Sequence, residues 1–197
     1  MDPAGLLTNI LLGATNIDKG RKNLATKGFE PSGRILYEDG ISLVLSIFKK
    51  AQDSLDPQTM ILVEKTFLQQ DLQFCDEADT VTRSSLTQAI QSFNDALRCL
   101  KTVEDSTLYK AVETAFPTNT AKYRYKGLPR DAVHYACGAH RTRLQNSLRT
   151  PGINMIEKAV LNQRIANTNK IKIAYTTKQK KSLNDTRDSL VMPTKMS

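Results

Sequence analysis

The residues best suited to chemistry lie in one row on a predicted helix. Both histidines of the chain and one of its three cysteines fall there, and four reactive side chains recur every three residues: Asp131, His134, Cys137 and His140. Residues three apart are neighbours on a helix surface. Such a row could supply soft metal ligands. It could also supply a Cys137 thiolate nucleophile, with a histidine as its base and Asp131 orienting that histidine.

Helix geometry argues against both interpretations. Each step of three residues rotates the row by ~60°, so its ends diverge by about 180° and cannot converge on one ion. Neither Cys75 nor Cys99 belongs to a C-x-x-C pair that would add ligands. We therefore predict no metal and no cofactor. We expect Cys137 to pack in a close helix contact made by the small residues 136–139, with His140 partly buried and hydrogen-bonded.

A second arrangement on the same helix is compared with a known type of nuclease. Helical ribonucleases of the HEPN family carry an arginine and a histidine separated by four to six residues, whereas three residues separate Arg130 from His134. The polar residue after the arginine fits that motif and the spacing does not, so the chain is not assigned to the family. A metal-independent ribonuclease, with His134 as general base and Arg130 stabilising charge, stays an alternative.

The net charge of the chain changes sign along its length. The 197 residues include 28 Lys and Arg and 20 Asp and Glu, a net charge of +8 with a pI of about 9.4. Residues 1–120 hold 12 basic and 16 acidic residues, a net of −4, whereas residues 121–197 hold 16 and 4, a net of +12. This asymmetry indicates either an anionic partner or docking of one half on the other.

The basic half contains a segment typical of nucleic-acid binding. Residues 122–126 alternate cations with tyrosines. Tyrosine rings can stack on unpaired bases while Lys and Arg contact phosphates. Arginines on the following helix extend this surface. Arg130 and Arg141 are eleven residues apart and Arg141 and Arg149 are eight apart, so the members of each pair project within about 80° of each other. The expected nucleic-acid-binding residues are Lys122, Tyr123, Arg124, Tyr125, Lys126, Arg130, Arg141 and Arg149.

These patterns predict a non-enzymatic helical protein that binds RNA or DNA through its basic C-terminal half. A positive charge does not by itself distinguish a nucleic acid from an acidic protein. The alternative is therefore a protein–protein interaction, in which a helical adaptor or inhibitor docks on an acidic protein partner. The chain has no P-loop, no G-x-G-x-x-G after a strand, no H-E-x-x-H and no G-x-S-x-G, which favours a binding protein over an enzyme. No pair of carboxylates is recognised in a predicted cleft.

Hydrophobic periodicity predicts the helices that would position these residues. Apolar residues recur at the i, i+3, i+4 spacing of amphipathic helices. Asp56 and Pro57 form an N-cap followed by a proline at the first helical position, which marks the start of one helix. From the N-terminus, the predicted helices occupy residues 5–14, 41–55, 57–75, 84–100, 105–116, 129–149 and 153–166.

Two stretches do not follow a helical pattern. Residues 15–34 contain Gly20, Gly28, Pro31 and Gly33 among polar residues, so an irregular connection is expected there. Residues 170–175 alternate polar and apolar side chains, which suits either a short edge strand or a continuation of the preceding helix.

The predicted fold class is all-α, a single-domain helical bundle of five to seven helices with a basic, partly irregular C-terminal tail. The helical domain spans residues 1–175, with an acidic part (1–120) and a basic part (121–175), and residues 176–197 form a flexible basic tail. No apolar run reaches the ~18 residues that span a bilayer. Three cysteines and no secretion signal indicate a cytoplasmic protein without membrane attachment, of open oligomeric state.

Overall fold

The computed structural model describes residues 2–52, 54–104 and 129–174. Within these ranges the chain forms six helices and no strand, which confirms the predicted all-α class. None of the described helices is long and apolar enough to cross a membrane. The helices are α1 (Pro3–Leu24), α2 (Glu30–Ala51), α3 (Pro57–Phe74), α4 (Thr80–Glu104), α6 (Pro129–Leu148) and a further helix at 155–174.

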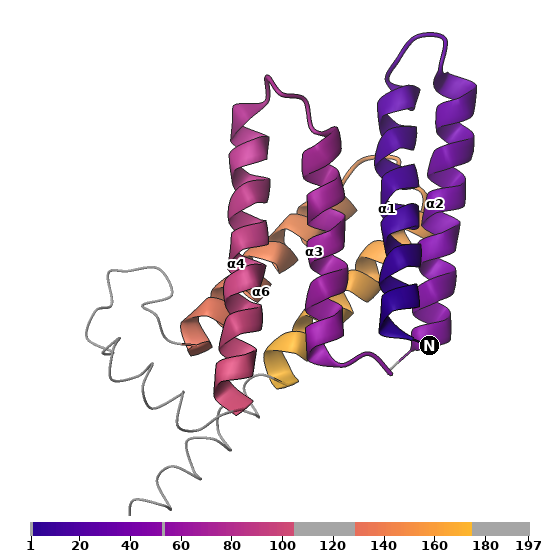
Figure 1. Cartoon of the computed structure of the whole chain (residues 1–197). Coiled ribbons are helices and arrows are strands. Elements are labelled where there is room, and N and C mark those ends of the chain that lie inside the picture. Colours follow the sequence, from indigo (N-terminus) through magenta and orange to yellow (C-terminus); the bar gives the residue numbers. More distant parts are fainter. Residues whose placement is uncertain (1, 53, 105–128, 175–197) are drawn as a thin grey trace, which may run out of the picture.

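The helices are arranged in two layers (Figure 1). In the first layer α4, α3, α1 and α2 stand side by side, so that the hairpins α1–α2 and α3–α4 are neighbours through α1 and α3. In the second layer α6 and the 155–174 helix cross behind the first at an oblique angle. Residues far apart in the sequence therefore meet where the two layers touch.

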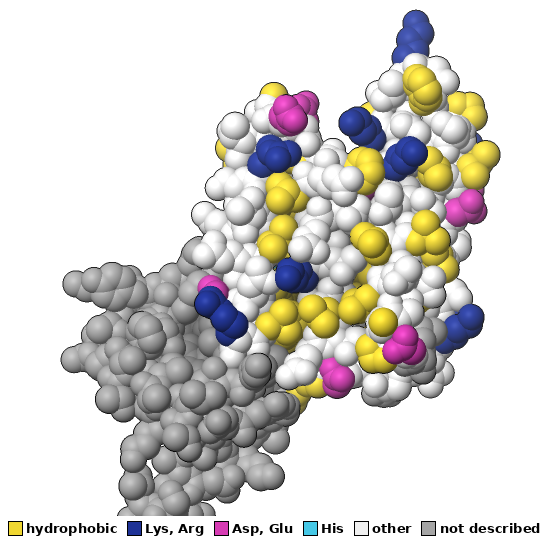
Figure 2. Space-filling view, viewed as in Figure 1, with side chains coloured by type: hydrophobic (Ala, Val, Ile, Leu, Met, Phe, Trp, Pro, Cys, Tyr) yellow, Lys and Arg dark blue, Asp and Glu magenta, His cyan; other side chains and the backbone are white. Residues whose placement is uncertain are grey.

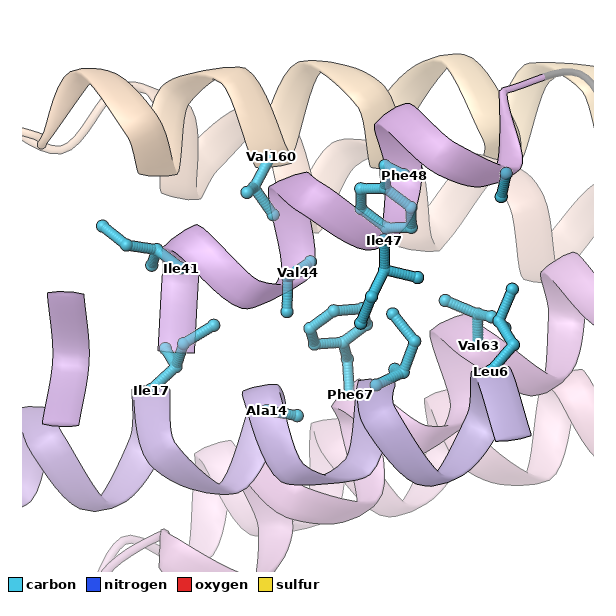
Figure 3. Packing of buried hydrophobic residues seen from close by; sticks show 12 residues of the cluster. Leu6, Ala14, Ile17, Ile41, Val44, Ile47, Phe48, Val63, Phe67 and Val160 are labelled. Carbon is cyan, nitrogen blue, oxygen red and sulfur yellow. The ribbon is translucent and has the colours of Figure 1, made fainter. Parts of the chain in front are cut away.

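The buried hydrophobic residues form two clusters that share α3. One cluster lies between α1, α2 and α3, and Figure 3 shows its side chains pointing toward one another. The other joins α3, α4, α6 and the 155–174 helix. Val63 and Phe67 belong to the first cluster, and Ile61 and Leu68 to the second. Each such side chain contributes ~1.5–3 kcal/mol when fully buried. Both clusters therefore depend on α3, and the 155–174 helix also adds a residue to each, Val160 to the first and Ile171 to the second.

The expectation of an irregular connection over residues 15–34 is wrong. Residues 15–24 continue α1 and residues 30–34 begin α2, so only residues 25–29 form a turn. The glycines and the proline of this stretch have other roles. Pro31 lies in the first turn of α2, where a missing N–H costs nothing, and Gly28 has a φ of 89° in the turn itself.

Glycines on α1 and α2 let the two helix backbones touch. A Cβ added to Gly20 would lie 2.5 Å from the backbone nitrogen of Tyr37, and one added to Gly33 would lie 2.8 Å from the carbonyl oxygen of Gly20. Seven residues away on each helix, a Cβ on Gly40 would lie 2.8 Å from the carbonyl oxygen of Gly13. Residues seven apart lie on almost the same line of a helix, so these pairs form one continuous contact.

Two predicted helix boundaries are confirmed: the start of α3 at Pro57 and the break after α6. The Asp56 side chain accepts a hydrogen bond from the backbone N–H of Thr59 at 2.7 Å, as expected for an N-cap that precedes Pro57. Gly152, in the predicted break after α6, has a φ of 71°. Residues 170–174 are helical, which makes the edge-strand alternative wrong for them.

Two predicted segments lie outside the described residues. These are the helix expected at 105–116 and the tail expected at 176–197.

The glycine contact predicts opposite effects for two matched substitutions. Gly20→Ala is expected to lower the free energy of unfolding by ~1–3 kcal/mol, because its methyl group forces the α1 and α2 backbones apart. Gly138→Ala is expected to raise it by up to ~1 kcal/mol, because an added Cβ meets nothing within 4 Å and alanine favours a helix. Urea unfolding followed by circular dichroism measures both, and an unchanged Gly20→Ala midpoint would contradict this packing.

Candidate functional site

The predicted nucleic-acid-binding residues are only partly described. Lys122, Tyr123, Arg124, Tyr125 and Lys126 lie outside the described residues. Arg130 lies in the first turn of α6, and its side chain is not among those described. Arg141 and Arg149 are both exposed, the first on α6 and the second directly after its end. The structure thus places two of the eight residues at the surface of the second layer.

The exposed charges described between residues 133 and 174 are all positive. The one acid of this stretch, Glu157, is buried; it accepts a hydrogen bond from the Tyr37 hydroxyl and forms an ion pair with Arg21. Glu157 therefore adds no negative charge to the surface of the second layer. The exposed cations of the stretch are Arg141, Arg149, Lys158 and Lys172.

Cys137 is a core residue. Its side chain is 2% exposed and belongs to the hydrophobic cluster of α3, α4 and α6. Burial raises the pKa of its thiol to about 12, against a weaker opposing effect of Lys172. A thiol with this pKa is protonated at neutral pH, and the thiolate is the nucleophile. The nucleophile alternative therefore gains no support from the structure.

The row of small residues on α6 is divided between two sides of the helix. Ala136 and Cys137 face the core, whereas Gly138 and Ala139 are exposed, so the four do not form the single close contact that was expected. Within the described ranges, no group of three or more His, Cys, Asp or Glu side chains could hold a metal ion.

His140 belongs to a buried charge network that joins the two layers. Its Nε2 lies 2.8 Å from Oε1 of Glu64 on α3, and Nε of Arg164 on the 155–174 helix donates to the same oxygen at 2.8 Å. Glu64 is 0% exposed and His140 is 1% exposed. Rings complete the surroundings: the Arg164 guanidinium lies 3.9 Å from the centre of Phe67, and the His140 ring meets Phe93 edge to face.

The protonation of this network follows from its contacts. Burial alone would raise the pKa of Glu64, but the Arg164 guanidinium and the hydrogen bonds from His140 and Arg164 outweigh it and hold the pKa below its ordinary value. Burial, together with the nearby Arg164 and Arg143 guanidinium groups, lowers the pKa of His140 against the opposing effect of Glu64. His140 is thus neutral near pH 7 and donates its Nε2 proton to Glu64. The ionised pair is Glu64 with Arg164.

A second group of charged side chains was not recognised from the sequence. Asp18 of α1 and Asp71 of α3 line one cavity of about 70 Å³ between the layers, together with Arg143 of α6. Oδ2 of Asp18 and Nε of Arg143 are buried and have no hydrogen-bond partner among the described residues. Burial, and then the neighbouring Asp71 carboxylate, raise the pKa of Asp18 to about 8. The structure therefore contains the carboxylate pair that the sequence analysis did not find.

This cavity is continuous with a groove at the surface. Asp18, Arg21, Asp71, Arg143 and Ser147 line both the cavity and a groove of about 1000 Å³. The groove runs between the C-terminal ends of α1 and α3 and the start of α4. In Figure 2 the molecule is notched between the tips of the two hairpins, with Lys and Arg side chains on both sides of the notch. A small molecule can thus reach the carboxylate pair from solvent.

The sequence carries one indication of these buried acids. Glu64 and Asp71 are seven residues apart, so they project in nearly the same direction from α3. On the surface of α3, this line lies between apolar residues of the two hydrophobic clusters. Phe67, on one side, belongs to the first cluster, and Leu68, on the other side, belongs to the second. Acids in the middle of a predicted buried face need partners of opposite charge. Looking for acids on predicted buried helix faces would identify Glu64 and Asp71, although not Asp18.

The Glu64 network predicts a large loss of stability in one variant. Glu64→Gln is expected to lower the free energy of unfolding by ~3–5 kcal/mol, because the buried Arg164 guanidinium would lose its counter-charge. Glu38→Gln, on the exposed face of α2, serves as the control and should leave stability unchanged. Urea unfolding of both variants measures the difference. Equal midpoints for the two would show that Glu64 is not the partner of Arg164 in solution.

The carboxylate pair predicts a pH-dependent difference in stability. The pKa of Asp18 is about 8 in the folded protein and its ordinary value is 3.8. The folded state therefore binds more protons between these values, and the stabilising contribution of Asp18 is lost as the pH rises toward 8. Asp18→Asn should gain in melting temperature over the wild type from pH 5 to 9. Asp39→Asn, on the exposed face of α2, should keep the wild-type profile; a pH-independent gap for Asp18→Asn would contradict the raised pKa.

The comparisons with known proteins add no relative to this description. No protein-family model, curated protein or solved structure matches the chain. The function is therefore argued from the charges, cavities and contacts of the chain itself.

Proposed function

We propose that the protein binds nucleic acid, without catalysis, through the cationic surface of its second layer. The observation that carries this proposal is the sign of the exposed charges described between residues 133 and 174, which are all positive. Phosphate binding by such a surface gains free energy from the release of counterions and requires no base contact. We therefore expect affinity for RNA or DNA with little preference for sequence.

The spacing of the cations supports contact with one phosphate backbone. Arg141 and Arg149 are eight residues apart, which corresponds to ~12 Å along a helix axis and a difference in direction of about 80°. One strand of duplex DNA has a phosphate every ~3.4 Å along its axis, so this separation spans several phosphates. Lys158, near the start of the next helix, adds a third exposed cation to the same layer.

Part of the basic half instead packs on the acidic half. Arg164 pairs with Glu64, and Arg143 lies beside Asp71 in the cavity, so these two arginines face the first layer. This accounts for docking between the halves, while Arg141, Arg149 and Lys158 stay exposed on the second layer. The ribonuclease alternative, with Arg130 and His134, has no supporting geometry among the described side chains.

The proposal predicts salt-dependent binding that one set of cations controls. Fluorescence anisotropy with a 20-nucleotide random-sequence RNA and the matching DNA should give micromolar affinity at 50 mM salt. Affinity should fall linearly with salt on logarithmic axes. The triple variant Arg141→Gln, Arg149→Gln, Lys158→Gln should bind at least tenfold more weakly and reduce the slope by roughly two to three.

A second triple variant controls for net charge. Lys19→Gln, Lys27→Gln and Arg34→Gln remove three exposed cations from the α1–α2 hairpin and should change binding little. Equal losses in the two triple variants would show that net charge and not the second layer determines binding. No binding of the wild type at 50 mM salt would overturn the proposal and leave the acidic protein partner as the remaining alternative.

A further inference from the structure

Three charged side chains between the layers lack a complete set of partners. Asp18, Asp71 and Arg143 line the cavity. Two further arginines, each of which forms an ion pair with a glutamate, also line it. Arg164 is bound by Glu64, and Arg21 by Glu157. Arg21 also lies 3.7 Å from Oδ1 of Asp18, so the four carboxyls of Asp18, Asp71, Glu64 and Glu157 face only three guanidinium groups.

Arg143 does not neutralise both aspartates. Its Nη2 donates to the Oγ and the carbonyl oxygen of Ser85 at 2.7 and 3.2 Å, and its Nε remains without a partner. Four carboxyls facing three guanidinium groups leave one excess negative charge in a partly buried site, which a proton on Asp18 removes. The titratable and charged groups that face Asp18 come from four helices: Arg21, Asp71, Arg143, Arg164 and Glu157.

The cavity has room for a ligand group and walls to hold its apolar part. A volume of about 70 Å³ exceeds the ~10–15 Å³ that one water needs. Its apolar walls come from α1, α3 and α6, and include Ile17, Phe67 and Leu144. The groove outside, of about 1000 Å³, has a size that suits small molecules and adds two further acids, Asp76 and Glu77.

We propose that this cavity and groove bind a small aliphatic amine, with an ammonium group between Asp18 and Asp71 and the methylene chain against the apolar walls. A diamine would place its second ammonium group near Asp76 and Glu77 in the groove. The excess of one carboxyl over the three guanidinium groups favours a cation over an anion. The ligand is organic because no group of three or more metal-binding side chains converges in the described part of the chain.

Binding would exchange one positive charge for another. The amine enters as an ammonium ion, and Asp18 releases its proton to solvent, so no bond other than that O–H bond is broken. At pH 7 the complex should release up to one proton, because Asp18 has a pKa of about 8 in the free protein. Since protons compete with the ligand for Asp18, affinity should rise as the pH increases from 6 to 8.

Calorimetry with three matched ligands tests the site on the full-length protein. 1,4-Diaminobutane and n-butylamine should bind, the diamine at least tenfold more tightly, whereas n-butanol, which has the same chain and no charge, should not bind. Titrations at pH 7 in two buffers of different ionisation enthalpy should show proton release. The proposal is wrong if neither amine binds at millimolar concentration, or if the amines bind without releasing protons.

Variants locate the ammonium group. Asp18→Asn and Asp71→Asn should each weaken binding of n-butylamine at least tenfold, while Asp39→Asn on the exposed face of α2 should not. The double variant Asp76→Asn, Glu77→Gln, at exposed positions, should reduce the affinity for the diamine to that for n-butylamine. It tests the groove even if a cavity variant does not fold. Unchanged affinity in the folded Asn variants would overturn the proposal.

The site is independent of the proposed nucleic-acid function. The triple variant of Arg141, Arg149 and Lys158 should bind amines as the wild type does, because these residues do not line the cavity or the groove. Conversely, Asp71→Asn should leave RNA binding unchanged. A failure of one proposal is thus distinguishable from a failure of the other.

Discussion

The ionised carboxylate of Glu64, fully removed from solvent, is the constraint on which the arrangement of the two layers depends. Its partners, His140 and Arg164, come from both helices of the second layer, so one side chain of α3 determines where each of those helices packs. A buried ion pair of this kind contributes little net stability but costs a great deal when it is broken. We infer that its main effect is to select one way of packing the layers.

Asp71 shows what the same geometry does when the partners are incomplete. It lies seven residues after Glu64 on α3 and faces the same interface between layers. Glu64 meets an arginine that it neutralises, whereas Asp71 meets Asp18 and an arginine that also bonds to Ser85. The result is an open, charged cavity in place of a closed network. The structural position, Glu64, and the proposed ligand-binding position, Asp71, thus differ in the balance of charge around them, although both are acids on a buried face of α3.

Local patterns predicted most of the helices, and contacts between helices explain what they missed. The Asp56 cap and the apolar stripes were sufficient for α3, α4 and α6, because those features act within one helix. Glycine in isolation favours loops, so the local pattern around Gly20 and Gly33 predicts a connection. Their role is a backbone contact that exists only when α1 meets α2. The partners of Glu64 are 76 and 100 residues away in sequence, and local periodicity cannot identify them.

The division of charge along the chain is not a division into two separate bodies. The basic helices α6 and 155–174 lie against the helices of the N-terminal part, and the contact takes Arg164 and part of Arg143 into the interface. The same contact buries Glu157 against Arg21, which removes the one acid between residues 133 and 174 from the cationic surface. Packing therefore separates the charges more sharply than the sequence does: exposed cations remain on the second layer, and an excess of carboxyls remains around the cavity. One folding event creates both the surface proposed for phosphates and the site proposed for amines.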